Sequence, residues 1–416
     1  MQTFSVPQLA WYGARPFNIT LPDEWEVEVC HMAGYNRPAL DPRAIAAAIS
    51  SPHGTPPLRE MARGKKNVVI VVDDMSRVTR TYEILPPILK ELADAGIRDN
   101  QIRIVMALGC HNAVGRNEFV RKLGEEVLCR FPVYNHNPFM NCTYVGTTAT
   151  FGTRVCINDE VMKCDLKIAI GSVVPHILSG FGGGGKIIMP GVAGFETVLF
   201  NHTAQSHYAA NHKDHPVSGM GMYRNNPMHK DIEEAAELVR LDFFVNALVN
   251  EWGETVSLYA GGFRPAYAAA LEEAKEHYRT KPTTGKDIAI ANTFAKASEG
   301  LIGLAAAIGA VSREGGDAVL LANAPDGQVV HYLMGPFGTG YGGPLWSPNS
   351  VPSHLNREII FTEYPDLAGE GWFDKSENRT FIHQWAQVVD LLWQNHGARA
   401  RVALFPCAEI QYFTAE

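Results

Sequence analysis

The sequence predicts an α/β protein: two α/β domains with mainly parallel sheets flanked by helices, and an active site in the cleft between them. Three observations support this fold class. The chain has 416 residues, which is long for a single domain. Short β-branched runs alternate with helical segments. A Lys/Pro/Thr/Gly break at 280–287 interrupts this alternation, so we place the first domain at 1–280 and the second at 286–416.

The first domain begins its predicted sheet with "NVVIVVDD" at 67–74, a β-branched run of the kind buried on both faces. An apolar pattern with helical spacing follows at 82–97 and ends near a glycine. Residues 101–109 predict a second strand, 116–128 an amphipathic helix, and 165–176 a third strand that runs into a loop. Strands that alternate with helices favour parallel pairing.

Two other segments of this domain have a different character. Residues 144–160 alternate Thr and Val around a glycine, which predicts a β-hairpin inserted into the α/β unit. Residues 233–279 are helical in composition, and we expect a largely helical stretch there.

The second domain repeats the alternation of strand and helix. Strands are predicted in "DIAIANT" (287–293), "DAVLLANAP" (317–325), "EIIFTEY" (358–364) and "ARVALFP" (400–406), and a helix in the segment 300–316. The chain shows no internal repeat that would change the fold class. A second layered α/β unit is therefore expected after the break.

Composition restricts the class of partner. The net charge of -8 argues against nucleic acid or an anionic membrane, which would call for basic patches, so a small solute is expected instead. The seven cysteines are dispersed and form no C-x-x-C pair, which indicates free thiols in a reducing compartment. The first residues lack a basic start and a long apolar core, and no run of about 18 apolar residues occurs. We expect a soluble cytoplasmic protein.

Three predicted strand ends in the first domain carry reactive side chains. "DDMSR" supplies Asp74, Ser76 and Arg77, "GCH" supplies His111, and "VVPH" supplies His176. Open α/β sheets bind ligands in the crevice at the carboxyl ends of their strands. A lone histidine is more often a structural residue, but three such ends together indicate one site.

The segment "SGFGGGGKIIMPG" at 179–191 is the most distinctive in the chain. Its consecutive glycines are Gly182, Gly183, Gly184 and Gly185. Glycine allows positive φ and a close approach of backbone N–H groups to an anion, so the run predicts a phosphate cradle. A flexible surface loop is the alternative interpretation. The triphosphate-binding pattern needs Ser or Thr after the lysine, whereas Ile187 follows Lys186 here.

Lys186 precedes an apolar segment, which would leave its amine at the base of a dry pocket. Burial disfavours a charged amine, lowers its pKa and makes it available for covalent chemistry. His202 follows on a helix predicted to begin near Gly194, and His176 precedes the loop. Two imidazoles and one amine can therefore face one pocket.

These segments resemble the lactate racemase family, whose members use a nickel-pincer nucleotide cofactor. The resemblance is carried by "PHILSGFGGGGKIIMPGVAGFET" followed by "NH", together with the upstream "DDMSR" and "ALGCH". It covers most of the chain in order and length. It is strongest from Asp74 to His202 and much weaker after Gly285.

The resemblance implies a covalently bound cofactor. It assigns Lys186 as the lysine joined through a thioamide to a pyridinium mononucleotide whose thiocarboxylate and thioamide sulfurs and ring carbon hold nickel. His202 is then the protein ligand to nickel, and imidazole with soft sulfur suits that metal. Asp74, Ser76 and the four glycines are implied to bind the cofactor, the glycines through its phosphate.

The same resemblance implies roles in catalysis. His111 and His176 match the two acid/base histidines, which we expect at the ends of adjacent strands. A racemase must take a proton from the hydroxyl of either enantiomer, so it needs one base on each side of the substrate. Arg77 matches the arginine that grips the substrate carboxylate with its planar fork.

The second domain departs from the family. The segment "NTFAKASEGLIGLAAAIGA" lacks the Tyr-Gln pair of the family and the lysine on the following helix that helps to hold lactate. We therefore expect a substrate other than lactate and name Lys296 and Ser298 as substitute substrate-binding residues. Trp385 matches a family tryptophan near the active site, with packing as the alternative.

The expected function is racemisation or epimerisation of a 2-hydroxy acid through a 2-keto acid, by an enzyme loaded by separate cofactor-biosynthesis enzymes. Two alternatives remain open. One is a phosphate- or nucleotide-binding transferase or hydrolase that uses the glycine loop with magnesium. The other is a non-catalytic sensor, which would not need His111 and His176 as bases.

Overall fold

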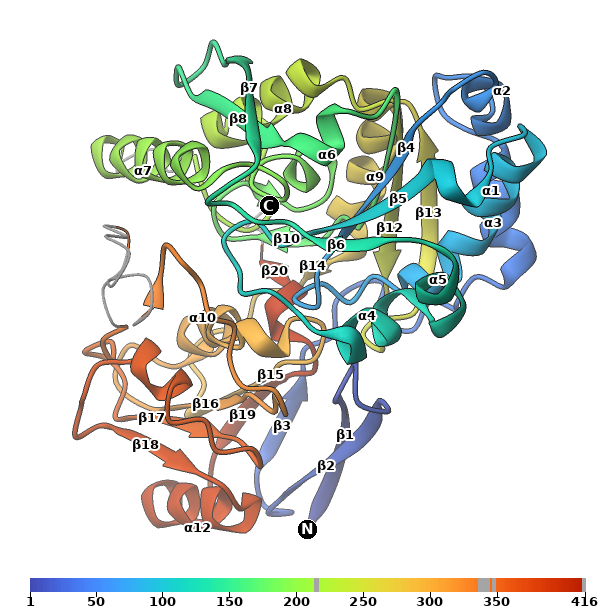
Figure 1. The fold of residues 1–416 in the computed structure, drawn as a ribbon. Helices are drawn as coiled ribbons and strands as arrows, with labels where there is room; N and C mark the ends of the chain where they lie inside the picture. The colour runs from blue at the N-terminus through green and yellow to red at the C-terminus, as the bar shows by residue number, and fades with distance from the viewer. Residues whose placement is uncertain (213–216, 336–344, 346–348, 414–416) are drawn as a thin grey trace.

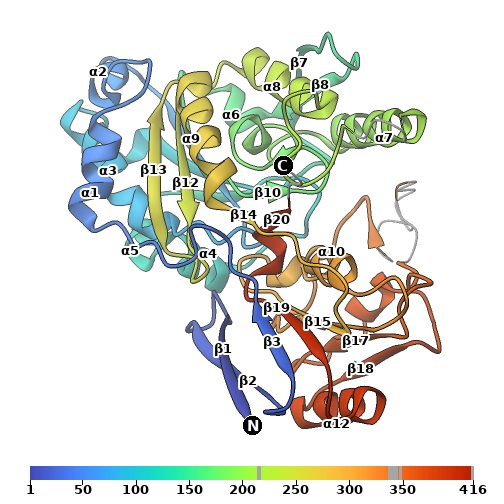
Figure 2. The same cartoon turned by 180° about the vertical axis from the view of Figure 1, so that it is seen from behind.

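The computed structural model describes residues 1–212, 217–335, 345 and 349–413. Within these residues the chain forms two six-stranded sheets, one in each half of the molecule (Figures 1 and 2). Helices cover both faces of each sheet, which confirms the predicted α/β class with mainly parallel sheets. No helix in this described part is long and apolar enough to traverse a bilayer.

The first sheet has the strand order β13-β12-β9-β4-β5-β6, and every neighbouring pair is parallel except the antiparallel pair β12 and β13. All six residues of β4 are buried, as its β-branched sequence predicts. The strands are β4 (Val68–Asp73), β5 (Ile102–Ala107), β6 (Val133–Asn135), β9 (Leu166–Ser172), β12 (Phe243–Val249) and β13 (Thr255–Gly261). The three strands expected between 67 and 176 are therefore confirmed.

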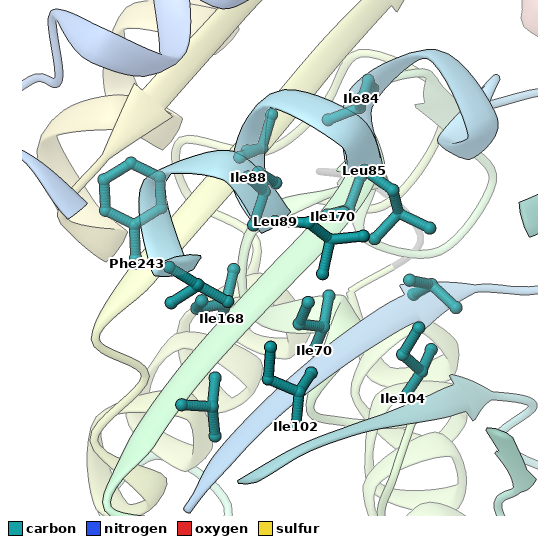
Figure 3. Close-up of a cluster of buried hydrophobic side chains, with 14 of the residues drawn as sticks. Ile70, Ile84, Leu85, Ile88, Leu89, Ile102, Ile104, Ile168, Ile170 and Phe243 are labelled. Atoms are coloured by element: carbon teal, nitrogen blue, oxygen red, sulfur yellow. The ribbon is translucent and has the colours of Figure 1, made fainter. Parts of the chain in front are cut away.

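One face of this sheet is covered by the early helices, and Figure 3 shows part of the contact. Ile84 and Ile88 of α3 are fully buried in the same cluster as Ile70 and Ile168 of the central strands. Each such side chain contributes roughly 1.5–3 kcal/mol by its burial. The helices of this face are α1 (Pro42–Ser50), α2 (Leu58–Ala62), α3 (Thr81–Asp94), α4 (Arg116–Leu123) and α5 (Glu125–Arg130).

The opposite face is covered by later helices and by the segment that follows the glycines. Val69 and Val71 of β4 share a buried cluster with Ile188 and with Ile232 of α8. The elements of this face are α6 (Asp159–Met162), the 3-10 helix η2 (Gly184–Ile187), α7 (Phe195–Asn211), α8 (Pro227–Val239) and α9 (Phe263–His277). α7 begins directly after Gly194, where the sequence predicted a helix start.

Two predictions for the first domain need correction. The stretch 233–279 is not largely helical, because β12 and β13 form an antiparallel pair between α8 and α9. The seven residues of β12 are all buried, so their apolar character reflects a central strand. The helix expected at 116–128 is split at Gly124, whose φ of 90° ends α4 before α5 begins.

The second sheet has the order β18-β17-β16-β15-β19-β3, and all of its neighbouring pairs are parallel. Its strands are β3 (Glu26–Val29), β15 (Ile288–Asn292), β16 (Asp317–Leu321), β17 (Arg357–Phe361), β18 (Arg379–Ile382) and β19 (Arg401–Phe405). α10 (Leu301–Ala310) packs on one face and α12 (Trp385–His396) on the other. The strands predicted after 286 are thus confirmed.

The start of the chain lies with the second sheet, although the sequence analysis assigned residues 1–280 to the first domain. β3 pairs with β19 at the sheet edge. The hairpin of β1 (Gln2–Gln8) and β2 (Arg15–Leu21) buries Val6 and Ile19 in the core of that half. Figures 1 and 2 both show this blue segment beside the red one. We therefore propose that the second domain is discontinuous in sequence.

Short strand pairs complete the fold. β7 (Cys142–Thr147) and β8 (Arg154–Asn158) form the antiparallel hairpin that was predicted at 144–160. β10 (Pro175–His176) pairs with β11 (Gly180–Phe181) and closes the loop before the glycines. β14 (Arg279–Thr280) pairs with β20 (Tyr412–Phe413), so the last described residues return to the junction of the two halves.

Candidate active site

A cavity of about 250 Å³ lies at the carboxyl ends of β4, β5 and β9 and is bounded on its other side by the second domain. It occupies the cleft in which the sequence predicted an active site. Ten of the predicted site residues line it: Asp74, Ser76, Arg77, His111, His176, Gly182, Gly183, Lys186, His202 and Ser298. Four do not: Gly184, Gly185, Lys296 and Trp385.

The loop after β4 is fixed by hydrogen bonds that begin at Asp74. The Asp74 carboxylate accepts from the backbone N–H of Ser76 at 3.0 Å, which closes an Asx-type turn. The buried ammonium of Lys122 donates to the carbonyls of Asp74 and Arg77 at 3.0 and 2.8 Å. These bonds hold the Arg77 guanidinium at the cavity, and sequence reasoning had not singled out Lys122.

His111 follows β5 and stands between two carboxylates. Its Nδ1 lies 2.6 Å from Oδ2 of Asp74, and its Nε2 lies 3.6 Å from Oε1 of Glu299. Burial lowers the pKa of His111, but the attraction of both carboxylates outweighs burial and raises that pKa above its ordinary value. Burial also raises the pKa of Asp74, yet the His111 charge brings the net pKa of Asp74 below its ordinary range.

His176 follows β9, on the other side of β4 from His111, so the two imidazoles do not stand on adjacent strands as expected. Its Nδ1 accepts from the backbone N–H groups of Leu178 and Ser179 at 3.1 and 3.2 Å. The proton of the neutral ring is therefore on Nε2. Burial, and then the charge of Lys186, lowers the pKa of His176 well below its ordinary value.

The Lys186 amine opens into the cavity, and its Nζ makes no hydrogen bond or ion pair with any described residue. Burial and the nearby Arg77 charge lower its pKa to about 7. An appreciable fraction of the amine is then neutral and nucleophilic near pH 7. The prediction of a lysine at the base of a dry pocket agrees with this placement.

The glycine run is buried and packed, which rules out the flexible surface loop. Gly182 and Gly183 line the cavity, and the buried hydroxyl of Ser172 beside them has no hydrogen-bond partner among the described residues. Gly184 and Gly185 face away from the cavity. A Cβ on Gly184 would meet the ring of Tyr267 at 2.6 Å, and one on Gly185 would meet the carbonyl of Ile232 at 2.8 Å. These two glycines are therefore needed for close packing, and their assignment to cofactor binding stays a prediction.

His202 lies on α7 and faces the same cavity. Its Nδ1 bonds to the carbonyl of Val198 one turn earlier, at 2.9 Å, which leaves Nε2 available. Burial, and then the Lys186 charge, lowers the pKa of His202 to about 3, so the ring is neutral as a metal ligand must be. Across the described ranges no three His, Cys, Asp or Glu side chains are grouped to hold a metal ion.

Two site residues come from the second domain and were not predicted. Glu299 accepts from Nη1 of Arg77 at 2.7 Å, across the cleft. His331 forms a backbone bridge with His111, and the two ring centroids are 5.1 Å apart. Burial lowers the pKa of His331 well below its ordinary value. Both residues stand in segments without a motif, so only the three-dimensional contact reveals them.

Lys296 and Ser298 were predicted to bind substrate, and the structure separates them. Ser298 lines the cavity. Lys296 is buried behind it, and its Nζ donates to the carbonyl of Pro175 at 2.9 Å, directly before His176. Burial, followed by the Arg77 charge, lowers the pKa of Lys296 to about 7. The substrate-binding assignment of Lys296 is corrected: it joins the second domain to the backbone that carries His176.

Trp385 packs in the core of the second domain. Its indole N–H donates to the carbonyl of Thr20 at 3.0 Å, and its ring meets that of Phe361 edge-on at 5.4 Å. Successive residues of a strand point to opposite faces, and the neighbouring Ile360 lines the cavity. Trp385 thus lies on the far face of the sheet, and the packing alternative replaces its assignment to substrate binding.

Comparisons with known proteins point to one family. The family model described as the lactate racemase N-terminal domain matches residues 12–213. A lactate racemase of Lactiplantibacillus plantarum is 28% identical over 307 residues, which are 72% of this chain and 70% of that protein. A lactate racemase of Thermoanaerobacterium thermosaccharolyticum is 29% identical over 269 residues, which are 64% of this chain and 61% of that protein.

Solved structures share the fold. The lactate racemase apoprotein from Thermoanaerobacterium thermosaccharolyticum superposes with a TM-score of 0.73 and 21% identity over 100% of both chains. A protein from Thermotoga maritima gives a TM-score of 0.67 and 18% identity over 91% of this chain and 100% of that one. The family model covers both strand-end histidines, Lys186 and His202, so residues 12–213 match a lactate racemase N-terminal domain, and the chain as a whole is similar to lactate racemases.

Proposed function

We propose that this protein interconverts the stereoisomers of a 2-hydroxy acid. One observation carries the proposal: Arg77 follows the central strand β4, while His111 and His176 follow the strands on either side of it. An anion held at β4 would therefore have one imidazole on each side. This is the arrangement that proton removal from either enantiomer requires. The two lactate racemases among its relatives support the same reaction class.

Arg77 is placed to bind the carboxylate. Its Nη1 is used by Ser76 and Glu299. Among the described residues, neither Nη2 nor Nε donates a hydrogen bond, so this edge of the guanidinium is free for a bidentate contact. Binding at this edge would orient the α-carbon and its hydroxyl between the two imidazoles.

The two imidazoles have different supports. His111 donates its Nδ1–H to the Asp74 carboxylate, which leaves Nε2 to exchange the hydroxyl proton and stabilises the imidazolium that results. His176 is oriented by two backbone N–H groups on Nδ1, so its Nε2–H lies on the opposite side and carries the proton that this ring can give.

The site fits the nickel-pincer nucleotide that the family resemblance implies. Lys186 offers an unpaired amine with a pKa of about 7 for the covalent link, and His202 offers a neutral Nε2 for the metal. The unpaired Ser172 hydroxyl beside Gly182 and Gly183 suits the polar end of a nucleotide. When bound, such a group would accept the hydride from the α-carbon. The substrate would then be a planar 2-keto acid, which can take the hydride back on either face.

Loading the protein tests the cofactor. We expect co-expression with the cofactor-building enzymes to give an intact-mass increase that maps to Lys186, together with stoichiometric nickel. Lys186→Ala should abolish the adduct, while His202→Ala should retain the adduct and lose nickel. Unmodified protein under these conditions would contradict the proposal and favour the phosphate-binding transferase or hydrolase.

Activity is tested with single enantiomers of 2-hydroxy acids, followed by chiral separation. We expect His111→Ala and His176→Ala each to reduce interconversion by about 10²–10⁴-fold, the usual contribution of an acid/base group. Retained activity in both variants would contradict the two-base scheme.

We also propose that the protein acts in the cytoplasm, which is supported by its seven free cysteines.

A further inference from the structure

We propose that the substrate is a 2-hydroxy monocarboxylic acid with a bulky apolar side chain, and that this side chain binds in a recess formed by the second domain. The inference rests on the proposed function. It concerns the part of the cavity that faces the reacting groups from across the cleft, where the chain departs from the family pattern.

The wall of this recess is made of large apolar side chains from several elements. It consists of Leu301, Ile302, Leu320, Ile360, Phe373 and Phe381. They come from the first turn of α10, from β16, β17 and β18, and from the residue after the 3-10 helix η4 (Gly369–Trp372). Leu301 and Ile302 lie within the segment 292–310, which lacks the family lysine. An apolar substituent buried here loses contact with water on all sides.

Two polar side chains of the same wall, those of Gln328 and Thr362, are already hydrogen-bonded to backbone groups. The side chain of Gln328 accepts from the backbone N–H of Gly300 and donates to the carbonyl of Ala297, each at 3.0 Å. The hydroxyl of Thr362 is bonded to both backbone groups of Tyr364 at 3.1 and 3.0 Å. A polyhydroxylated acid would have to break these bonds or leave its own hydroxyls unpaired. This favours an apolar side chain over a sugar chain.

Glu299 adds discrimination against a second acid group. Its carboxylate projects from the second domain onto Arg77 and lies near His111. It takes one guanidinium nitrogen and leaves the Nη2 and Nε edge for a single carboxylate. A substrate with a carboxylate at the far end of its side chain would enter a recess that has a negative charge at its mouth and apolar walls.

Loaded wild-type enzyme is assayed with four acids: lactate, 2-hydroxy-4-methylpentanoate, malate and gluconate. We expect kcat/KM for 2-hydroxy-4-methylpentanoate to exceed that for each of the others by at least about tenfold, since one methylene in an apolar pocket changes discrimination by this order. The same ranking is expected from calorimetric titration of these acids into protein that carries no cofactor.

Ile302→Lys places a cation in the recess. We expect it to lower kcat/KM for 2-hydroxy-4-methylpentanoate by about tenfold or more and to raise that for malate. Ile302→Leu keeps an apolar wall and serves as the matched control, with the wild-type ranking retained. Phe381→Ser is a second test of the wall, in case the lysine variant fails to fold.

The outcomes separate the inference from the function on which it rests. A wild-type preference for lactate, malate or gluconate overturns the apolar recess and leaves the racemase intact. A preference for 2-hydroxy-4-methylpentanoate that survives both Ile302→Lys and Phe381→Ser also overturns it, because the side chain must then bind elsewhere. Calorimetric binding of the apolar acid without interconversion of any acid by the loaded enzyme contradicts the function while supporting the recess.

Discussion

At the scale of single residues, the cavity holds imidazoles whose titration is driven in opposite directions by their neighbours. His111 faces carboxylates on both ring nitrogens, which raise its pKa against the effect of burial. His176 has no carboxylate partner and lies near cationic Lys186 and Lys296, which lower its pKa beyond the effect of burial. One ring therefore favours the charged form and the other the neutral form, because their neighbours shift the two pKa values in opposite directions.

Asp74→Asn should shift the titration of His111 to lower pH, because it removes the closest anion from the imidazolium. The pair stabilises the fold where Asp74 is ionised and His111 is protonated. Its contribution is lost as pH rises through the raised pKa of His111, and as pH falls through the lowered pKa of Asp74.

The measurement is an NMR titration of the histidine ring protons in both proteins. His136 serves as the internal control, because its burial alone lowers its pKa to about 4 and it does not depend on Asp74. An unchanged midpoint for His111 in the variant would show that another group sets its protonation.

Prediction of site residues from the sequence succeeded where these residues belong to short contiguous motifs. The strand ends and the lysine after the glycines lie at the cavity because parallel strands bring their carboxyl ends together. Glu299 and His331 were missed because they reach the site only by contact between the two halves of the molecule. Trp385 shows the reverse case, since a match in sequence did not place its ring at the cavity.

At the scale of elements, the glycine run is a packing element as much as a binding loop. Gly184 has a φ of 52° and lies against the ring of Tyr267, whose hydroxyl donates to the carbonyl of Gly182 at 3.2 Å. The turn into η2, and with it the position of Lys186, depends on this close approach of backbone to ring. Only glycine combines the left-handed backbone with so little space.

Gly184→Ala should destabilise the protein by about 2 kcal/mol or more, because the added methyl strains the backbone and overlaps the ring. Gly309→Ala is the matched control, since Gly309 is an exposed residue of α10 with no atom within 4 Å of the added methyl. The control should gain about 0.5–1 kcal/mol. Urea unfolding measures both, and equal stabilities of the two variants would contradict this account of the loop.

Element boundaries were predicted best where the hydrophobic period is clear. β4 and β9 were found as short, largely apolar runs. β12 was hidden, because its apolar run lies between two helices and its period cannot distinguish a buried strand from a buried helix. The helix break at Gly124 was not predicted, because a single glycine is tolerated inside a helix unless the chain must turn at that residue.

At the scale of the whole molecule, the second domain is assembled from both ends of the chain. Leu21 and Trp25 are buried in one cluster with Val402 and Leu404 of β19, and the Trp25 indole donates to the carbonyl of Gly397 at 2.9 Å. Sequence reasoning placed the break at 281–285 because only that junction has a linker composition. The strand β3 crosses to the second sheet without such a signal.

A fragment of residues 286–416 should therefore fail to fold by itself, because it lacks β3 and exposes the apolar side chains that the N-terminal hairpin covers. Joining residues 1–31 to this fragment through a flexible linker should restore a cooperative thermal transition and near-ultraviolet circular dichroism. Cooperative unfolding of the short fragment alone would show that the hairpin is an accessory rather than part of the domain.

The contact between Lys296 and the carbonyl of Pro175 has a mechanical consequence. The ammonium belongs to one half of the molecule, and the carbonyl precedes the residue whose ring Nδ1 is fixed by the next turn of backbone. A rigid-body rotation of one half relative to the other would be transmitted through this hydrogen bond and would move His176 relative to Arg77. The orientation of the His176 imidazole therefore depends on the distance between the two halves, and catalysis would proceed only at one such distance.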